Sequence, residues 1–150
     1  RLHAYPLQVS KTGEGARQLL KTLKANRSLA MLADQKHREG IAVPFFGRDA
    51  MTVPGPAVLS MRTGAAVVPV TMERTKGARF RMVFHPQIEI ARTGDTAADA
   101  RAGLLKINQW LESVVRAQPA MWLWAHDRWD DRPRKNRKPV RQEGIGGAAS

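Results

Sequence analysis

The chain has 150 residues, of which 43% are hydrophobic, so it is long enough and apolar enough to bury one core. Its formal net charge of +12 indicates an anionic partner, such as nucleic acid, anionic lipid or a phosphorylated substrate. The lack of cysteine excludes disulfides and thiolate metal sites, and no apolar run reaches the roughly 18 to 20 residues that span a bilayer.

The N-terminal third predicts a helix followed by a buried strand. Residues 13–26 have apolar side chains at helical spacing, with Asn26 as the cap, and the apolar run 28–34 favours a strand that ends at Asp34. Ligands of open α/β sheets bind beyond the carboxyl ends of strands, so Asp34 is the first candidate site residue. A capping role for this aspartate is the alternative.

Residues 35–56 are rich in glycine and proline and predict a long loop, too apolar to be a linker. The loop is not a P-loop, because no Gly-Lys-Ser/Thr follows its glycines. Arg48, directly after Gly47, could still hold an anion, although a solvated loop arginine is an equal alternative.

The middle of the chain predicts a short helix over 57–64, ended by Gly64, and a hairpin of strands 65–74 and 78–86. In the second strand we expect Phe80, Met82 and Phe84 to be buried and the opposite face to be basic. The order of helices and strands over the whole chain indicates an α/β sandwich with a mixed sheet.

A second long helix follows. Thr96-x-x-Asp99 reads as a capping box, and the helix is expected to run to about Arg116 before Pro119. Its expected inward residues are Leu104, Ile107, Leu111 and Val114.

The C-terminal end combines an aromatic cluster with positive charge. Residues 121–129, "MWLWAHDRW", contain three of the four tryptophans together with His126 and Arg128, and 131–150 lack a hydrophobic pattern and predict a disordered basic tail. The tail is either merely solvated or binds nucleic acid or an anionic membrane. His126 is either a base or a packed structural residue. Asp34-x-x-His37 is the only close pair of metal-ligand type, so we expect no metal site.

Several motifs together resemble one family. Asp34-Gln35, "VPFFGR" at 43–48, Thr52, the Gly64…Pro69 stretch and Trp124-x-His126-x-Arg128-Trp129 are similar, in order and spacing, to the C-terminal half of the lipid A biosynthesis (lauroyl/myristoyl) acyltransferases. The resemblance runs from about Arg1 to Trp129. It implies a mixed-sheet α/β/α sandwich of the glycerolipid acyltransferase type over 1–130, with the tail at 131–150.

The resemblance also implies a reaction without a cofactor. A fatty acyl group passes from acyl carrier protein to a hydroxyl of a lipid A precursor, at the cytoplasmic face of the bacterial inner membrane. The family's His-x4-Asp/Glu motif, whose histidine is the general base, is expected upstream of Arg1, so the chain is expected to be a fragment, inactive alone. Asp34 matches an acidic position that orients this base. Gly47, Arg48, His126 and Arg128 are the expected substrate-binding residues.

Two departures qualify the match. The wider superfamily carries Phe-Pro-Glu-Gly where this chain has "VPFFGR". His126 and Asp131 have the His-x4-Asp spacing, but they follow the third motif and run directly into the tail, so we do not assign them as the catalytic pair.

The alternative hypothesis is a small basic nucleic-acid-binding protein. It accounts for the net charge and the tail, but not for the apolar loop or the buried strand ending at Asp34. No aromatic RNA-binding run or recognition-helix pair is visible in the sequence, so we expect no nucleic-acid partner.

Overall fold

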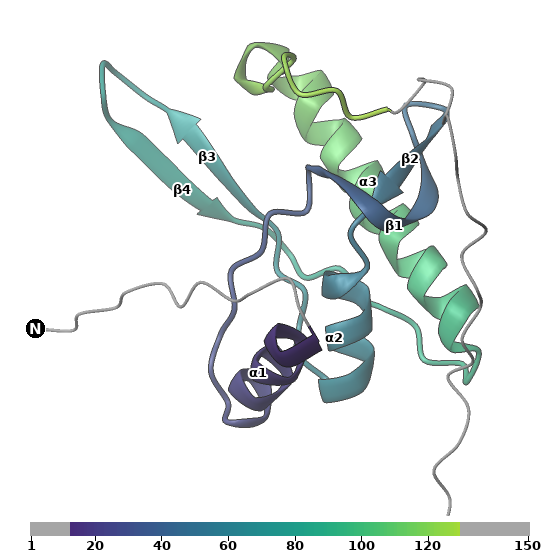
Figure 1. Ribbon diagram of the computed structural model, residues 1–150. Coiled ribbons are helices and arrows are strands. Elements are labelled where there is room, and N and C mark those ends of the chain that lie inside the picture. The colour runs from purple at the N-terminus through teal and green to yellow at the C-terminus, as the bar shows by residue number, and fades with distance from the viewer. Residues whose placement is uncertain (1–12, 130–150) are drawn as a thin grey trace, which may run out of the picture.

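The computed structural model describes residues 13–129, and their secondary structure is mixed α/β. In chain order the elements are α1 (Gly13–Lys24), β1 (Lys36–Phe45), β2 (Arg48–Thr52), α2 (Gly55–Thr63), β3 (Val70–Arg74), β4 (Phe80–Phe84), α3 (Thr96–Ala117) and a 3-10 turn, η1 (Pro119–Met121). The β1–β2 pair lies against α3, α1 and α2 lie together at one end, and the β3–β4 pair extends away from the body (Figure 1). The α/β class is confirmed.

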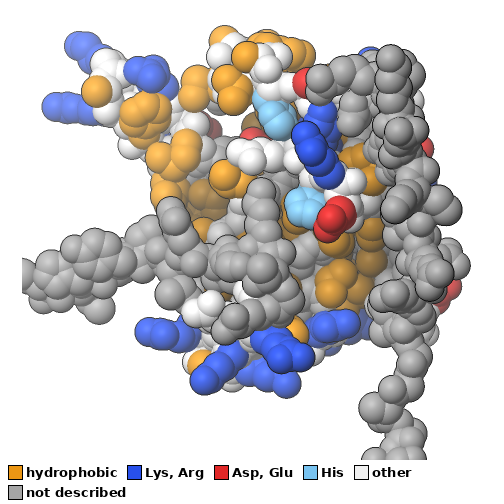
Figure 2. Space-filling model, viewed as in Figure 1, with side chains coloured by type: hydrophobic (Ala, Val, Ile, Leu, Met, Phe, Trp, Pro, Cys, Tyr) orange, Lys and Arg blue, Asp and Glu red, His pale blue; other side chains and the backbone are white. Residues whose placement is uncertain are grey.

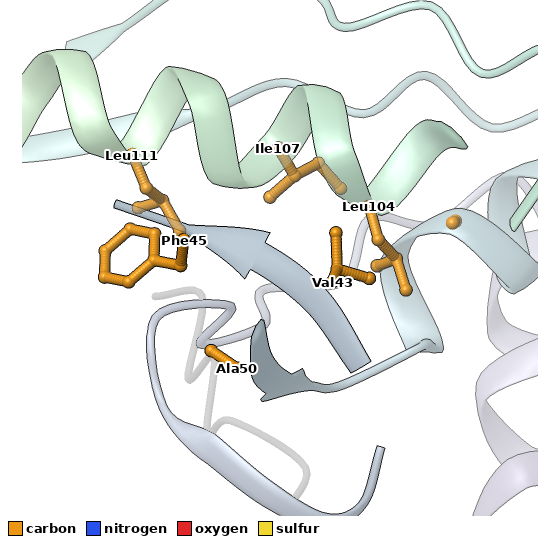
Figure 3. Packing of buried hydrophobic residues seen from close by; sticks show 7 residues of the cluster. Val43, Phe45, Ala50, Leu104, Ile107 and Leu111 are labelled. Carbon is orange, nitrogen blue, oxygen red and sulfur yellow. The ribbon is translucent and has the colours of Figure 1, made fainter. Parts of the chain in front are cut away.

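The core lies between β1 and α3, as Figure 3 shows. Val43 and Phe45 alternate along β1 and point to the same side, where they meet Leu104, Ile107 and Leu111, which recur along one face of α3. Ala50 of β2 and Ala57 of α2 complete the cluster. The inward positions predicted for α3 are confirmed for these three residues, whereas Val115 is buried in place of the half-buried Val114.

The expectations for residues 28–56 were wrong in two respects. The apolar run at 28–34 is not a strand, and Leu32 is 72% exposed, because no described strand lies beside this segment to pair with it. The stretch expected to be a loop is instead the antiparallel β1–β2 hairpin. Its turn is possible because Phe46 and Gly47 both adopt left-handed backbone conformations, with φ of 51° and 76°.

The second hairpin is confirmed, but its predicted burial is wrong. β3 and β4 pair in register, with Val70 opposite Phe84 and Met72 opposite Met82. These side chains share one face with Phe80, and Phe84 is 68% exposed. Since the hairpin extends away from the body, none of the described elements covers that face (Figure 1). The described strands form two separate two-stranded antiparallel sheets, not one mixed sheet.

The helix ends mostly follow the predicted signals. Asn26 and Gly64, the expected caps of α1 and α2, adopt left-handed backbone with φ of 56° and 81°. At α3, however, Asp95 is the N-cap and accepts from the backbone N–H groups of residues 97 and 98. Asp99 instead accepts from the backbone N–H and hydroxyl of Thr93, so the predicted capping box is displaced. None of the described helices is both long and apolar enough to cross a bilayer.

Candidate functional site

Asp34 lies two residues before β1, at the open end of the β1–β2 hairpin. Its Oδ1 atom is sheltered from solvent and has no hydrogen-bond partner among the described residues. Buried carboxylate oxygens are normally hydrogen-bonded, so an unpaired one marks a position where a donor is expected. A small pocket of about 50 Å³ adjoins it, lined by Asp34, Gln35, Trp122, Leu123 and His126. The pocket has room for about one or two water molecules, far less than a lipid needs.

His126 is fixed against the start of β1. Its Nε2 accepts a hydrogen bond from the backbone N–H of Lys36 at 3.0 Å. An imidazole that accepts through Nε2 carries its proton on Nδ1 when neutral. The Lys36 ammonium lies 3.5 Å from the carboxylate of Asp127, which adds a second link between the two segments. The structure therefore brings His126 and Asp34 together, while Asp131, its partner in the His-x4-Asp spacing, lies outside the described residues.

Arg128 is 0% exposed and is the largest fully buried side chain among the described residues. Its guanidinium donates to the carbonyl of Met51 and to Oγ1 of Thr52, both at 2.9 Å, and lies over the ring of Phe45 at 5.3 Å. Burial lowers the pKa of the Arg128 guanidinium, and the negative charge of Asp34 opposes that shift. The charges of Arg128 and Asp34 are therefore electrostatically linked across the site.

Asn108 is a participant that the sequence did not single out. Its side-chain amide is fully buried and donates to the carbonyl of Pro44 at 3.0 Å and to Oγ1 of Thr52 at 3.3 Å. Thr52 thus receives hydrogen bonds from both Asn108 and Arg128, which lie 56 and 76 residues further along the chain. The available signal was a polar residue at i+4 from Leu104, on the inward stripe of α3.

The tryptophans divide into packed and exposed ones. Trp129 stacks on Phe45 with centroids 5.5 Å apart and donates its indole N–H to the Phe45 carbonyl at 3.1 Å. Trp122 lies 5.8 Å from the same ring. Trp124 is 63% exposed, although its indole N–H donates to the carbonyl of Pro119 at 2.8 Å. Trp122 and Trp129 thus hold this segment onto β1, and the indole of Trp124 faces solvent.

Gly47 and Arg48 lie at the opposite end of the hairpin from Asp34. Arg48 is exposed, and its guanidinium carbon lies 5.5 Å from the centroid of Trp129. Thr52 comes four residues after it along β2, which at the rise of a strand is about 13 Å. The site therefore has two parts, which are the Asp34–His126–Arg128 cluster and the exposed turn at Gly47–Arg48. Histidine, lysine and arginine side chains share one face with apolar ones in Figure 2.

Comparisons with known proteins show the family of the chain. The sequence model described as "Bacterial lipid A biosynthesis acyltransferase" matches residues 6–131. Over 121 residues the chain is 31% identical to a lipid A biosynthesis palmitoleoyltransferase of Escherichia coli, which covers 78% of this chain and 38% of that protein. It is 30% identical over 112 residues to a phosphatidylinositol mannoside acyltransferase of Mycobacterium tuberculosis, with 74% and 34% covered.

The chain spans less than two fifths of the length of these relatives. The family match nevertheless covers all of the described residues, including the Asp34–His126–Arg128 cluster and the Gly47–Arg48 turn. The chain belongs to the bacterial lipid A biosynthesis acyltransferase family.

Proposed function

We propose that this chain forms the C-terminal portion of an acyltransferase that transfers a fatty acyl group from acyl carrier protein to a hydroxyl of a lipid A precursor. Family membership supports acyl transfer in glycolipid biosynthesis, since relatives named for lipid A and for phosphatidylinositol mannoside both match. In the complete enzyme we expect the α/β/α sandwich of the glycerolipid acyltransferases, to which residues 1–130 contribute the C-terminal portion.

The reaction needs a base, because a sugar hydroxyl is a poor nucleophile near neutral pH. The acceptor oxygen attacks the thioester carbon while its proton passes to the imidazole of the family's His-x4-Asp/Glu motif, which we place upstream of Arg1. The carbon–sulfur bond then breaks, and the carrier thiolate leaves and takes up a proton. In this chain, Asp34 orients that imidazole and stabilises it when it becomes positively charged.

One observation carries this assignment, and it is the sheltered, unpaired Oδ1 of Asp34 at the edge of the small pocket. A carboxylate oxygen in this state can accept from the N–H of an imidazole. Arg128 and His126 fix its surroundings from two sides, through Thr52 at the end of β2 and through Lys36 at the start of β1. Preorganised positioning of this kind is what a catalytic base requires.

Arg48, His126, Arg128 and Gly47 remain our proposed substrate-binding residues. Arg48 suits a phosphate of the acceptor, because it is exposed at a turn that Gly47 makes possible. The burial of Arg128 supports a contribution made through Asp34 and β2. The net charge of +12 supports binding to the anionic cytoplasmic face of the inner membrane. The basic tail at 131–150, to which we assign part of that binding, lies outside the described residues.

The test is Asp34→Asn in the complete enzyme. We expect turnover to fall by about 10²-fold or more with an unchanged circular dichroism spectrum, as for orienting carboxylates in triads. Asp49→Asn is the matched control, because Asp49 is an exposed aspartate on β2 and its replacement should leave turnover near normal. Near-normal turnover of Asp34→Asn would remove Asp34 from the catalytic site.

A further inference from the structure

Helix α1 carries a stripe of positive charge along one side. Arg17, Lys21 and Lys24 recur at i, i+4 and i+7, so they lie above one another over about 10 Å of the helix. All three are exposed, and among the described residues no carboxylate forms an ion pair with them. Lysine and arginine side chains gather at the end of the molecule where Figure 1 places α1 and α2 (Figure 2).

The apolar side of α1 faces α2 and forms a pocket with it, of about 160 Å³. Its walls are mostly aliphatic, and Arg62 is the only charged residue among the described ones that line it. The lining consists of Ala16, Leu19, Leu20, Pro54, Gly55, Val58, Leu59 and Arg62. An apolar pocket of this volume, with a single cation among its lining residues, suits part of a hydrocarbon chain whose attachment point is polar or anionic.

This pocket adjoins the segment that leads to Asp34. The terminal methyl of Met31 lies 2.5 Å from where a β-carbon on Gly55 would be, so the start of α2 and the segment before Asp34 touch. Thr52, three residues before Gly55, receives the hydrogen bond from Arg128. The α2 end of the pocket is thus linked to the Asp34–His126–Arg128 cluster in two ways, through Met31 in the segment before Asp34 and through Thr52, which binds Arg128.

We propose that the pocket between α1 and α2 takes the acyl chain of the donor, and that the positive stripe of α1, with Arg62, binds the acidic surface of its carrier protein. The inference rests on the proposed function and locates the donor site within it. Complementary charge orients a protein partner, and burial of methylenes in the pocket makes the complex specific for the loaded carrier.

The charge part is tested by fluorescence anisotropy with a labelled carrier protein and the full 150-residue chain. We expect Lys21→Glu combined with Lys24→Glu to weaken binding at least tenfold at low salt. The control is Lys76→Glu combined with Arg79→Glu, two exposed residues at the β3–β4 turn. Each pair reverses two charges and so changes the net charge of +12 by the same four units, to +8. The control pair should bind within about threefold of the unaltered chain.

The pocket part is tested with carriers whose acyl chains lengthen in steps. We expect affinity to rise by up to about fourfold for each methylene until the pocket is full. Ala16→Phe places a ring at the exposed edge of the pocket, so it should abolish this dependence and leave the affinity for the unloaded carrier unchanged. Circular dichroism checks that the variant folds.

Three outcomes would overturn the inference in different ways. Equal weakening by both charge pairs would mean that net charge, not α1, attracts the carrier. If the variant with Lys21→Glu and Lys24→Glu bound the carrier as tightly as the unaltered chain, or if Ala16→Phe kept the dependence on acyl-chain length, the donor site would lie elsewhere. The proposed function would be unaffected. If the unaltered chain bound no loaded carrier but bound anionic vesicles through α1, the face would be a membrane contact, and the donor site of the complete enzyme would lie elsewhere.

Discussion

Arg128→Lys isolates the part of the site that is built around a buried guanidinium. Arginine reaches the Met51 carbonyl and Thr52 Oγ1 together, at 2.9 Å each, through two nitrogens of one planar group. A lysine ammonium is a single point and cannot occupy both positions, so at least one charge-assisted hydrogen bond is lost. Such a bond contributes about 1.5–3 kcal/mol. For a domain of this size, that loss lowers Tm by about 3–12 °C.

The measurement is thermal unfolding followed by circular dichroism, with Arg48→Lys as the matched control. Arg48 is exposed, and surface substitutions usually change the unfolding free energy by less than about 0.5 kcal/mol, so its Tm should change by no more than about 2 °C. Thr52→Val alone and Thr52→Val combined with Arg128→Lys complete a double-mutant cycle, in which we expect a coupling of at least about 0.5 kcal/mol. A Tm for Arg128→Lys within about 1 °C of the unaltered chain would refute this account of the buried network.

Three further predictions concern function. In the complete enzyme, Arg48→Lys should raise KM for the lipid acceptor, because lysine does not reproduce a bidentate contact with an anion. Arg128→Lys should raise KM indirectly, because it loosens the end of β2 beside Asp34. An unchanged KM in either variant removes that residue from the acceptor site. Deleting 132–150 should weaken binding to anionic vesicles, most at low salt, because each basic residue near such a surface contributes on the order of 1 kcal/mol. The deletion should barely change Tm, and a Tm lower by many degrees would show that the tail is packed structure. The 150 residues alone should transfer no acyl group from a loaded carrier to a lipid A precursor, and transfer that His126→Ala abolishes would show that the His126–Asp131 pair is the catalytic centre.

Local signals in the sequence predicted the helices well, and long-range partners account for the errors. Periodicity and caps located α1, α2 and α3, because these features depend on residues within one or two turns. The β1–β2 hairpin was missed because its glycines and prolines indicate a loop, whereas its burial depends on α3, some sixty residues later. The apolar face of β3–β4 was predicted to be buried because apolar and basic residues alternate along the strand. This alternation indicates which residues share a face, but it does not indicate what covers that face.

The candidate site shows the same division. Asp34 was chosen as a strand-end carboxylate, yet no strand of the described structure ends there. Its catalytic role therefore stays a prediction, supported by the unpaired Oδ1 atom and not by the reason first given for it. The family resemblance, and not the local pattern, gave Asp34 its predicted role of orienting the base. Arg128 was chosen as a cation for lipid phosphates, while its full burial follows from contacts with Phe45, Met51 and Thr52, which no spacing within 121–129 could reveal.

The buried links to Thr52 also fix when the hairpin can be completed during synthesis. Met51 and Thr52 receive their donors from Arg128, 77 and 76 residues later in the chain, and Thr52 also depends on Asn108. Until those residues have left the ribosome, the end of β2 has polar groups that are unsatisfied unless water reaches them. The hairpin can therefore form early only as a hydrated intermediate, and a nascent chain stalled before Arg128 would present an open site to proteases and chaperones.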